Sequence, residues 1–146
     1  MNISIRRACE DDIAPLTKIV ATNYSKAFAE QFGPEISCAF MPYPFRPNFL
    51  VAERDGVPIG CACWMSDWLS WGVFNISWVQ VAKDAQRGGV GRMLVKECLD
   101  RIFAQGNCAL LATDIPDYYA RWWGFQTKHS YMSNEGVEYS IMALNA

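Results

Sequence analysis

The sequence predicts an α+β fold with α/β/α layers, in which a mixed central sheet of about six or seven strands lies between helices. Segments with alternating apolar residues, typical of strands, recur along the whole chain. Between them lie segments with an apolar residue every three or four positions, typical of helices. In the middle of the chain, a strand pattern, a glycine-rich turn and a helical pattern follow one another over residues 79–95.

Length and composition indicate one globular domain over residues 1–146. A chain of 146 residues is long enough to bury a core. Its composition, with 51% hydrophobic and 19% charged residues, excludes disorder. The net charge of −2 gives no reason to expect nucleic acid as a partner. No apolar run approaches the ~18 residues of a membrane span, and the N-terminus lacks a signal-peptide pattern. We therefore expect a cytoplasmic protein with no membrane partner.

The cysteines point to a reducing compartment rather than to disulfides or metal. The chain has no C-x-x-C pair and only one histidine, so we expect no metal site. Most of the six cysteines have apolar neighbours, which predicts small buried residues. They are Cys9, Cys38, Cys61, Cys63, Cys98 and Cys108.

The first elements follow from alternation and from helix signals. Ile3–Arg7 alternates and predicts a short strand. Asp11 or Asp12 can cap the next helix, whose apolar face consists of Ile13, Leu16, Ile19 and Val20. A second helix is predicted at Ser25–Phe32, ending at Gly33-Pro34, and a short third helix at Glu35–Met41. Three prolines within residues 42–47 exclude regular structure there.

The middle of the chain predicts a hairpin and then a long strand. Phe49–Glu53 and Ile59–Asp67 are the two arms, joined at Arg54-Asp55-Gly56. Trp71-Gly72 turns the chain into the strand Val73–Val81.

The last third predicts two helices and three strands. The helix Gly89–Ala104 has an apolar stripe and ends at Gly106. The remaining elements are a strand at Cys108–Thr113, a short helix at Tyr118–Trp123, and weaker strands at Thr127–Met132 and Val137–Leu144.

The turn Gln86-x-x-Gly89-x-Gly91 predicts an anion site. Glycines let a ligand approach the backbone, and the following helix directs its first free N–H groups and its partial positive charge into the turn. Such a site most often holds a phosphate. Lys83, Arg87 and Arg92 add positive charge around it.

The turn resembles the pyrophosphate-binding motif of the GNAT acetyltransferases, [QR]-x-x-G-x-[GA]. Its spacing fits neither the dinucleotide fingerprint nor the NTPase phosphate loop. The predicted order of elements is also similar to that of the GNAT fold over nearly the whole chain. The resemblance implies an acetyl-CoA-dependent N-acetyltransferase, with fourth and fifth strands that splay apart to admit the pantetheine arm. The residues implied in cofactor binding are Val79, Gln80, Val81, Gln86, Arg87, Gly88, Gly89, Val90, Gly91 and Arg92.

A tyrosine is the implied proton donor to the leaving thiolate. The family pattern is Y-x-x-x-G-F, and this chain has Tyr118-Tyr119-Ala120-Arg121-Trp122-Trp123-Gly124-Phe125. Tyr119 lies one position too early, and a helical bulge could absorb the extra residue. We favour Tyr119 as the acid and keep Tyr118 as the second candidate, with mere packing as the alternative role.

The general base is less defined. Many family members carry a glutamate on the fourth strand, but residues 73–81 contain no carboxylate. Asp67 and Asp114 are substitutes, and a water chain could also remove the proton. His129 lies beyond the helix and is expected to be an ordinary exposed side chain. The oxyanion donor implied by the resemblance is the backbone N–H near Val79.

Aromatic residues predict the acceptor class. We expect most of Trp64, Trp68, Trp71 and Trp78 in the core, with some of them facing the acceptor. Phe40, Tyr43 and Phe45 could form a lid over it. An aromatic-walled pocket favours a small apolar or cationic amine. The alternatives are a protein or peptide amine, and an acyl-CoA-binding module without catalysis. Monomer and homodimer both remain open.

Overall fold

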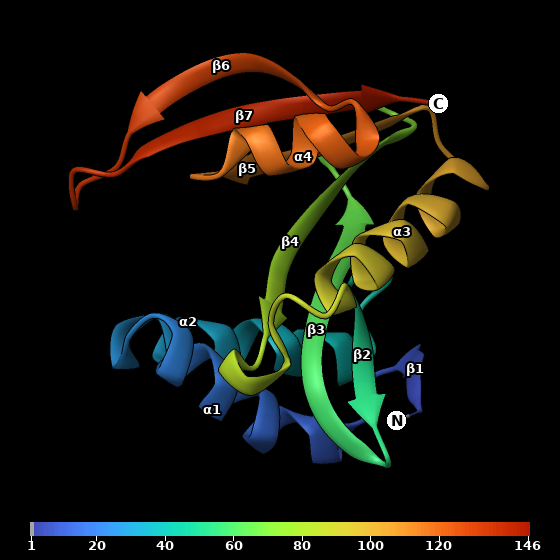
Figure 1. Ribbon diagram of the computed structural model, residues 1–146. Coiled ribbons are helices and arrows are strands. Elements are labelled where there is room, and N and C mark those ends of the chain that lie inside the picture. Colours follow the sequence, from blue (N-terminus) through green and yellow to red (C-terminus); the bar gives the residue numbers. More distant parts are fainter. Residues whose placement is uncertain (1) are drawn as a thin grey trace.

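The computed structural model describes residues 2–146 and contains one open, mixed sheet of seven strands (Figure 1). Its strands lie in the order β1-β2-β3-β4-β5-β7-β6, and only β4 and β5 pair in parallel. The strands are β1 Ile3–Arg7, β2 Asn48–Arg54, β3 Val57–Ser66, β4 Val73–Val81, β5 Cys108–Thr113, β6 Gln126–Met132 and β7 Glu138–Asn145. The helices are η1 Glu10–Asp12, α1 Ile13–Asn23, α2 Lys26–Ser37, η2 Cys38–Phe40, η3 Lys83–Ala85, α3 Val90–Phe103 and α4 Pro116–Trp123.

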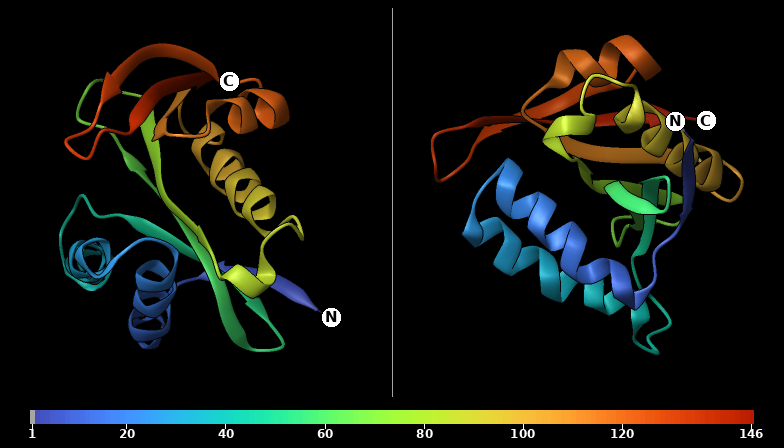
Figure 2. Two further views of the ribbon diagram at one scale, coloured as in Figure 1. Left: turned by 60° about the vertical axis from the view of Figure 1, so that its left-hand side comes forward. Right: turned by 60° about the horizontal axis from the view of Figure 1, so that its bottom comes forward.

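Helices cover both faces of the sheet, as the predicted layers require (Figure 2). One cluster of buried side chains joins α1 and α2 to one face of β2 and β3, with Phe32 and Phe49 among its largest members. The other cluster joins α3 and α4 to the opposite face, with Leu94 and Phe125 fully buried. Successive side chains along β2 and β3 point to opposite faces of the sheet, so both strands contribute residues to both clusters.

The predicted end of a helix at Gly33-Pro34 is wrong. The helix α2 continues through Pro34 to Ser37, and η2 follows directly. Proline removes one hydrogen bond from a helix interior. However, Phe32 and Ile36 are fully buried on either side of it and hold the helix against the sheet. Burial of such side chains outweighs the local cost of proline.

The strands β4 and β5 splay apart after a short shared segment. Their parallel pairing covers only Val73–Asn75 and Cys108–Leu110. Beyond Asn75, the edge of β4 toward β5 has no strand partner, whereas its other edge continues to pair with β3. The predicted splayed arrangement is therefore confirmed.

The helix α4 begins earlier than the sequence pattern indicates. Pro116 occupies its first turn, a position where proline costs no hydrogen bond. The helix then runs without interruption, and the N–H of Gly124 donates to the carbonyl of Ala120 in ordinary α-helical spacing. The bulge considered for this helix is thus not present.

Two expectations about burial are also wrong in part. Trp64 is buried and Trp78 is half-buried, but Trp68 and Trp71 project into solvent from the turn between β3 and β4. Among the cysteines, Cys9 is exposed, and Cys38 and Cys108 are only partly buried. A turn side chain has no neighbouring layer to cover it, so apolar character alone does not bury it.

Candidate active site

The glycine-rich turn forms a concave backbone surface at the start of α3. Arg87 and Gly89 both have left-handed backbone angles, with φ of 66° and 83°. Alternation of right- and left-handed residues turns successive N–H groups toward one point. Gly89 is also the residue that caps α3, so the free N–H groups of the first helical turn lie beside it.

The unpaired edge of β4 begins next to this turn. The N–H of Ala82 donates to Ile59 on β3, so the neighbouring Val81 presents its backbone groups to the opposite edge. There the carbonyl of Val81 accepts hydrogen bonds from Gln86 at 3.0 Å and from Asn23 at 2.9 Å. Gln86 therefore fixes the glycine-rich turn against the end of the strand.

A β-bulge interrupts β4 where the two strands separate. Cys61 pairs with Gln80 and Cys63 pairs with Ser77, so Trp78 and Val79 together face one residue of β3. Trp78 has a φ of 50°, which is rare for a bulky side chain. The bulge changes the direction of the backbone groups around Val79, the predicted oxyanion donor.

Tyr118 and Tyr119 both face this region from α4. A Cβ atom at Gly91 would lie 3.4 Å from the Tyr118 hydroxyl, so Tyr118 covers the first turn of α3. Tyr119 is only 7% exposed and packs against Trp123 and Phe125. Burial raises the pKa of both phenols, while the charge of Arg92 lowers that of Tyr118. Both side chains remain protonated near neutral pH and can donate.

One cavity of about 710 Å³ unites these groups. It extends from the glycine-rich turn along the free edge of β4 to α4. Eleven predicted site residues line it: Val79, Gln80, Val81, Gln86, Arg87, Gly89, Val90, Gly91, Arg92, Tyr118 and Tyr119. Of the remaining predicted residues, Gly88 belongs to the same turn but does not line the cavity, and Asp67 lies elsewhere.

The cavity fits the parts of coenzyme A. The N–H groups of the turn and the side chain of Arg92 suit a pyrophosphate. The buried Oδ1 atom of Asn23, which also lines the cavity, has no hydrogen-bond partner among residues 2–146. Such an acceptor suits an amide N–H of the pantetheine arm. No spacing pattern in the sequence links Asn23 to β4, because 57 residues separate it from Gln80.

Asp67 does not join the tyrosines. It follows β3 at the far end of β4, where its carboxylate accepts hydrogen bonds from the backbone of Leu69 at 2.8 Å and from Asn75 at 3.0 Å. It therefore shapes the turn between β3 and β4. None of the predicted lid residues Phe40, Tyr43 and Phe45 lines the cavity, and Phe45 packs against Trp68 of this same turn.

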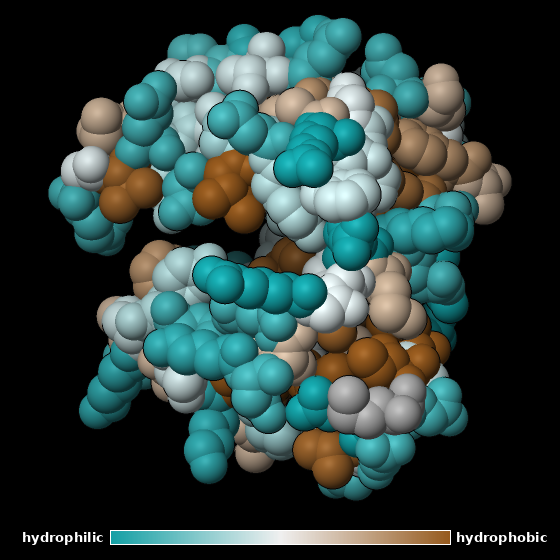
Figure 3. Space-filling model, in the orientation of Figure 1, coloured by the Kyte–Doolittle hydropathy of each residue, from teal (hydrophilic) through white to brown (hydrophobic). Residues whose placement is uncertain are grey.

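A smaller hollow of about 150 Å³ lies between the separating strands, beside the bulge. Tyr24, Trp78, Tyr119 and Tyr139 line it together with the carboxylate residue Asp114. The indole N–H of Trp78 donates to the carboxylate of Glu35 on α2. Figure 3 shows a cleft that opens between α2 and the β6–β7 hairpin. The sequence did not identify Glu35, because α2 and β4 meet only in the folded chain.

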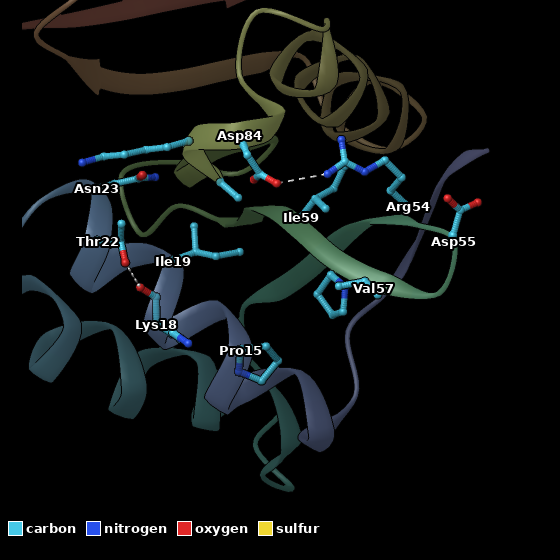
Figure 4. Close-up of a pocket in the computed structure, with 13 residues that line it drawn as sticks. Pro15, Lys18, Ile19, Thr22, Asn23, Arg54, Asp55, Val57, Ile59 and Asp84 are labelled. Atoms are coloured by element: carbon cyan, nitrogen blue, oxygen red, sulfur yellow. Dashed lines mark hydrogen bonds and ion pairs between the residues drawn. The ribbon is translucent and has the colours of Figure 1, made fainter. Parts of the chain in front are cut away.

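A separate cavity of about 660 Å³ lies between α1, the β2–β3 turn and η3 (Figure 4). Ile19 and Ile59 contribute apolar surface, and the ion pair of Arg54 with Asp84, at 3.2 Å, crosses its upper side in Figure 4. None of the predicted site residues lines it. Asn23 lines both this cavity and the larger one along β4.

Comparison with known proteins supplies a family match. The model of the acetyltransferase (GNAT) family matches residues 13–125. No curated protein matches the chain. Within residues 2–146, no helix has the length and apolar character needed to cross a membrane.

Solved structures share the fold at low sequence identity. A GNAT-family protein from Desulfovibrio desulfuricans, assigned as an acetyltransferase, is 19% identical with a TM-score of 0.86, and the match covers 99% of both chains. The acetyltransferase-like protein YncA from Salmonella typhimurium, solved with its cofactor acetyl-CoA, is 20% identical with a TM-score of 0.72, over 98% of this chain and 93% of its own. A ribosomal-protein-alanine N-acetyltransferase from Brucella melitensis is 22% identical with a TM-score of 0.76, over 98% and 99%.

Proposed function

The chain belongs to the GNAT acetyltransferase family, and we propose that it moves an acetyl group from acetyl-CoA to the amine of a small cationic molecule. It is thus an acyl-CoA-dependent N-acetyltransferase, and acetyl-CoA is its co-substrate. In this proposal residues 1–146 act as one domain in the cytoplasm. The free thiols of all six cysteines are consistent with that reducing compartment.

One observation supports a small cationic acceptor above the alternatives. The hollow between β4 and β5 measures only about 150 Å³, has aromatic walls and includes Asp114. A second carboxylate, that of Glu35, is bonded to the wall residue Trp78. Aromatic faces and carboxylates both attract an ammonium group, and the small volume suits one short amine better than a peptide chain.

The proposed chemistry is direct attack of the neutral amine on the carbonyl carbon of the thioester. Bound acetyl-CoA supplies that thioester. A nitrogen–carbon bond forms, the carbon–sulfur bond breaks, and the amine loses one proton. The N–H near Val79 is the proposed oxyanion donor, and Tyr119, with Tyr118 as second candidate, is the proposed donor of a proton to the leaving sulfur.

The proton of the amine needs an acceptor near the hollow. Asp114 lines the hollow itself. The carboxylate of Glu35 accepts a hydrogen bond from Trp78, which lines the hollow. Of the two base candidates from the sequence, Asp67 and Asp114, we therefore propose Asp114, and we add Glu35 in place of Asp67; either carboxylate takes the proton directly or through water.

A screen of thioester consumption tests the proposal. Acetyl-CoA is mixed with the protein and, in turn, with monoamines, polyamines, amino acids and peptides. The proposal expects turnover with a small cationic amine. Turnover with peptide or protein amines alone would favour the alternative suggested by the Brucella enzyme. Binding of acetyl-CoA without turnover on any amine would indicate a silent binding module.

A further inference from the structure

Two turns at the end of the sheet opposite the glycine-rich turn expose several large apolar side chains. Trp71 is 100% exposed and Trp68 is 82% exposed, both in the turn between β3 and β4. The ring centre of Phe45, from the proline-rich segment before β2, lies 5.1 Å from that of Trp68. We define the aromatic surface as the five largely exposed apolar residues Tyr43, Phe45, Trp68, Leu69 and Trp71.

Hydrogen bonds fix the backbone of both turns. The carboxylate of Asp67 accepts hydrogen bonds from the backbone of Leu69 and from Asn75, which fixes the β3–β4 turn. The guanidinium of Arg46 donates to the carbonyl of Met41 at 3.0 Å and fixes the other turn. A turn backbone that is already ordered loses little entropy when a partner covers it.

A receiving pocket lies beside the projecting tryptophans. It has a volume of about 260 Å³ and lies between the Pro44–Arg46 segment and β3. Trp64 lines it, and its buried indole N–H has no acceptor among residues 2–146. A buried donor without a partner is costly, so the pocket favours an occupant that brings a carbonyl or another acceptor.

From these features we propose that the aromatic surface joins two copies of this chain in a symmetric dimer. Each copy carries a projecting turn and a receiving pocket side by side. A two-fold axis can therefore place the Trp68–Trp71 turn of each copy into the pocket of the other, where its backbone carbonyls meet Trp64.

Area and charge agree with a second copy as the occupant. At about 150–250 Å² for each fully buried aromatic side chain, the surface supplies roughly 700 Å² on each copy. A standard interface needs about 800 Å² per partner. Segments 41–48 and 64–74 contain one cation, Arg46, and one anion, Asp67, so two copies do not repel each other. Nucleic acid and anionic lipid would require a basic surface instead.

Sedimentation velocity tests the dimer. It is measured on the chain at protein concentrations from about 1 to 200 μM, the range in which interfaces of this size assemble. We expect wild type to shift from monomer to dimer. The double variant Trp68→Ser with Trp71→Ser should weaken association about 30-fold or more, as loss of an interface hot spot does. Val57→Ser is the matched control, because Val57 is also exposed but is the first residue of β3, at the opposite end of that strand from the aromatic surface. Its association should equal that of wild type.

Two results would overturn the dimer. Wild type that stays monomeric at the highest concentration excludes it, and co-sedimentation of that monomer with phosphatidylcholine vesicles would assign the surface to a membrane. Equal association of wild type and the double variant would place any dimer contact elsewhere. The thermal shift caused by acetyl-CoA, measured on every variant, shows that each one is folded.

Discussion

The guanidinium carbon of Arg92 lies 4.0 Å from the centre of the Trp122 ring, so a cation on α3 rests on an aromatic side chain of α4. The same guanidinium lies 3.1 Å from the position that a Cβ atom would take at Gly89. Trp122 thus holds the charge of Arg92 over the anion site. An exposed cation–π pair contributes about 0.5–1 kcal/mol.

The contact between Arg92 and Trp122 predicts that the two residues act together in cofactor binding. Trp122→Leu should weaken acetyl-CoA binding about 2–5-fold, because Arg92 loses its support. Calorimetry on Trp122→Leu, Arg92→Met and the double variant measures the coupling. If the two single effects simply add, the two residues bind the cofactor independently.

A second prediction concerns the glycine-rich turn. With acetyl-CoA at 100 times its dissociation constant, the folded state gains about 2.7 kcal/mol. The melting temperature should rise by roughly 5–15 °C for a chain of this length. Gly89→Glu should abolish the rise, because a carboxylate would occupy the anion site.

The control for this variant is Gly136→Glu. Gly136 has a φ of 79°, close to the 83° of Gly89, but lies between β6 and β7, where an added Cβ atom would meet open space. Both variants therefore carry a similar backbone strain. Loss of the thermal shift in both variants would mean that strain, and not the anion site, causes the effect.

A third prediction separates the two tyrosines. Tyr119→Phe retains the packing against Trp123 and Phe125 but removes the hydroxyl. Turnover should fall about 10²–10⁴-fold, with acetyl-CoA affinity nearly unchanged. Tyr118→Phe should have a much smaller effect. Steady-state assays with the amine from the screen decide between them, and a reversed order would make Tyr118 the donor.

A fourth prediction addresses the acceptor. Glu35→Gln keeps an oxygen that can accept from the indole of Trp78 but removes the negative charge. KM for a cationic amine should rise about tenfold, equivalent to about 1.4 kcal/mol. Glu30→Gln, on the same helix, is the control and should leave KM unchanged. An unchanged KM in Glu35→Gln would mean that the acceptor is not held by this carboxylate.

A fifth prediction concerns acid stability. Hydrogen bonds from the Arg6 guanidinium lower the pKa of Asp12, and they outweigh burial, which raises it. The folded pKa thus lies below the unfolded value of about 4. The ion pair therefore stabilises the protein above about pH 4, and this contribution is lost as the pH falls.

Asp12→Asn tests this dependence. The variant should lose about 1–3 kcal/mol at neutral pH, because the half-buried guanidinium of Arg6 loses one of its two carboxylate partners and keeps only Glu53. Its unfolding free energy, measured with urea between about pH 5 and 3, should also fall less steeply than that of wild type. Asp84→Asn removes an exposed pair with Arg54 and should change stability by less than about 1 kcal/mol.

Local patterns in the sequence predicted much of this fold and of the candidate cofactor cleft. The glycine-rich turn, the end of β4 and the start of α3 are adjacent in the sequence, so residue spacing alone describes them. Gln86 illustrates this, because it bonds Val81 only five positions away.

Contacts between distant segments explain what the sequence did not show. Asn23 and Glu35 reach β4 from helices far away in the chain. Asp67 directly follows β3, the strand beside β4, but the antiparallel pairing of the two strands places it at the end of β4 away from the tyrosines. The sequence pattern predicted a helix end at Pro34 because it does not show that Phe32 and Ile36 are both buried and hold the helix against the sheet.

The short seam between β4 and β5 has a consequence for motion. Within residues 2–146, the strand pairing between the two halves of the sheet is limited to the pairs from Val73 with Cys108 to Asn75 with Leu110. Beyond that seam, the halves can spread or close about Asn75 without breaking a ladder hydrogen bond. A pantetheine arm in the gap would act as a substitute strand. Amide hydrogen exchange at Val79 and Val81 should therefore slow when the cofactor is bound, while Val73 is protected throughout.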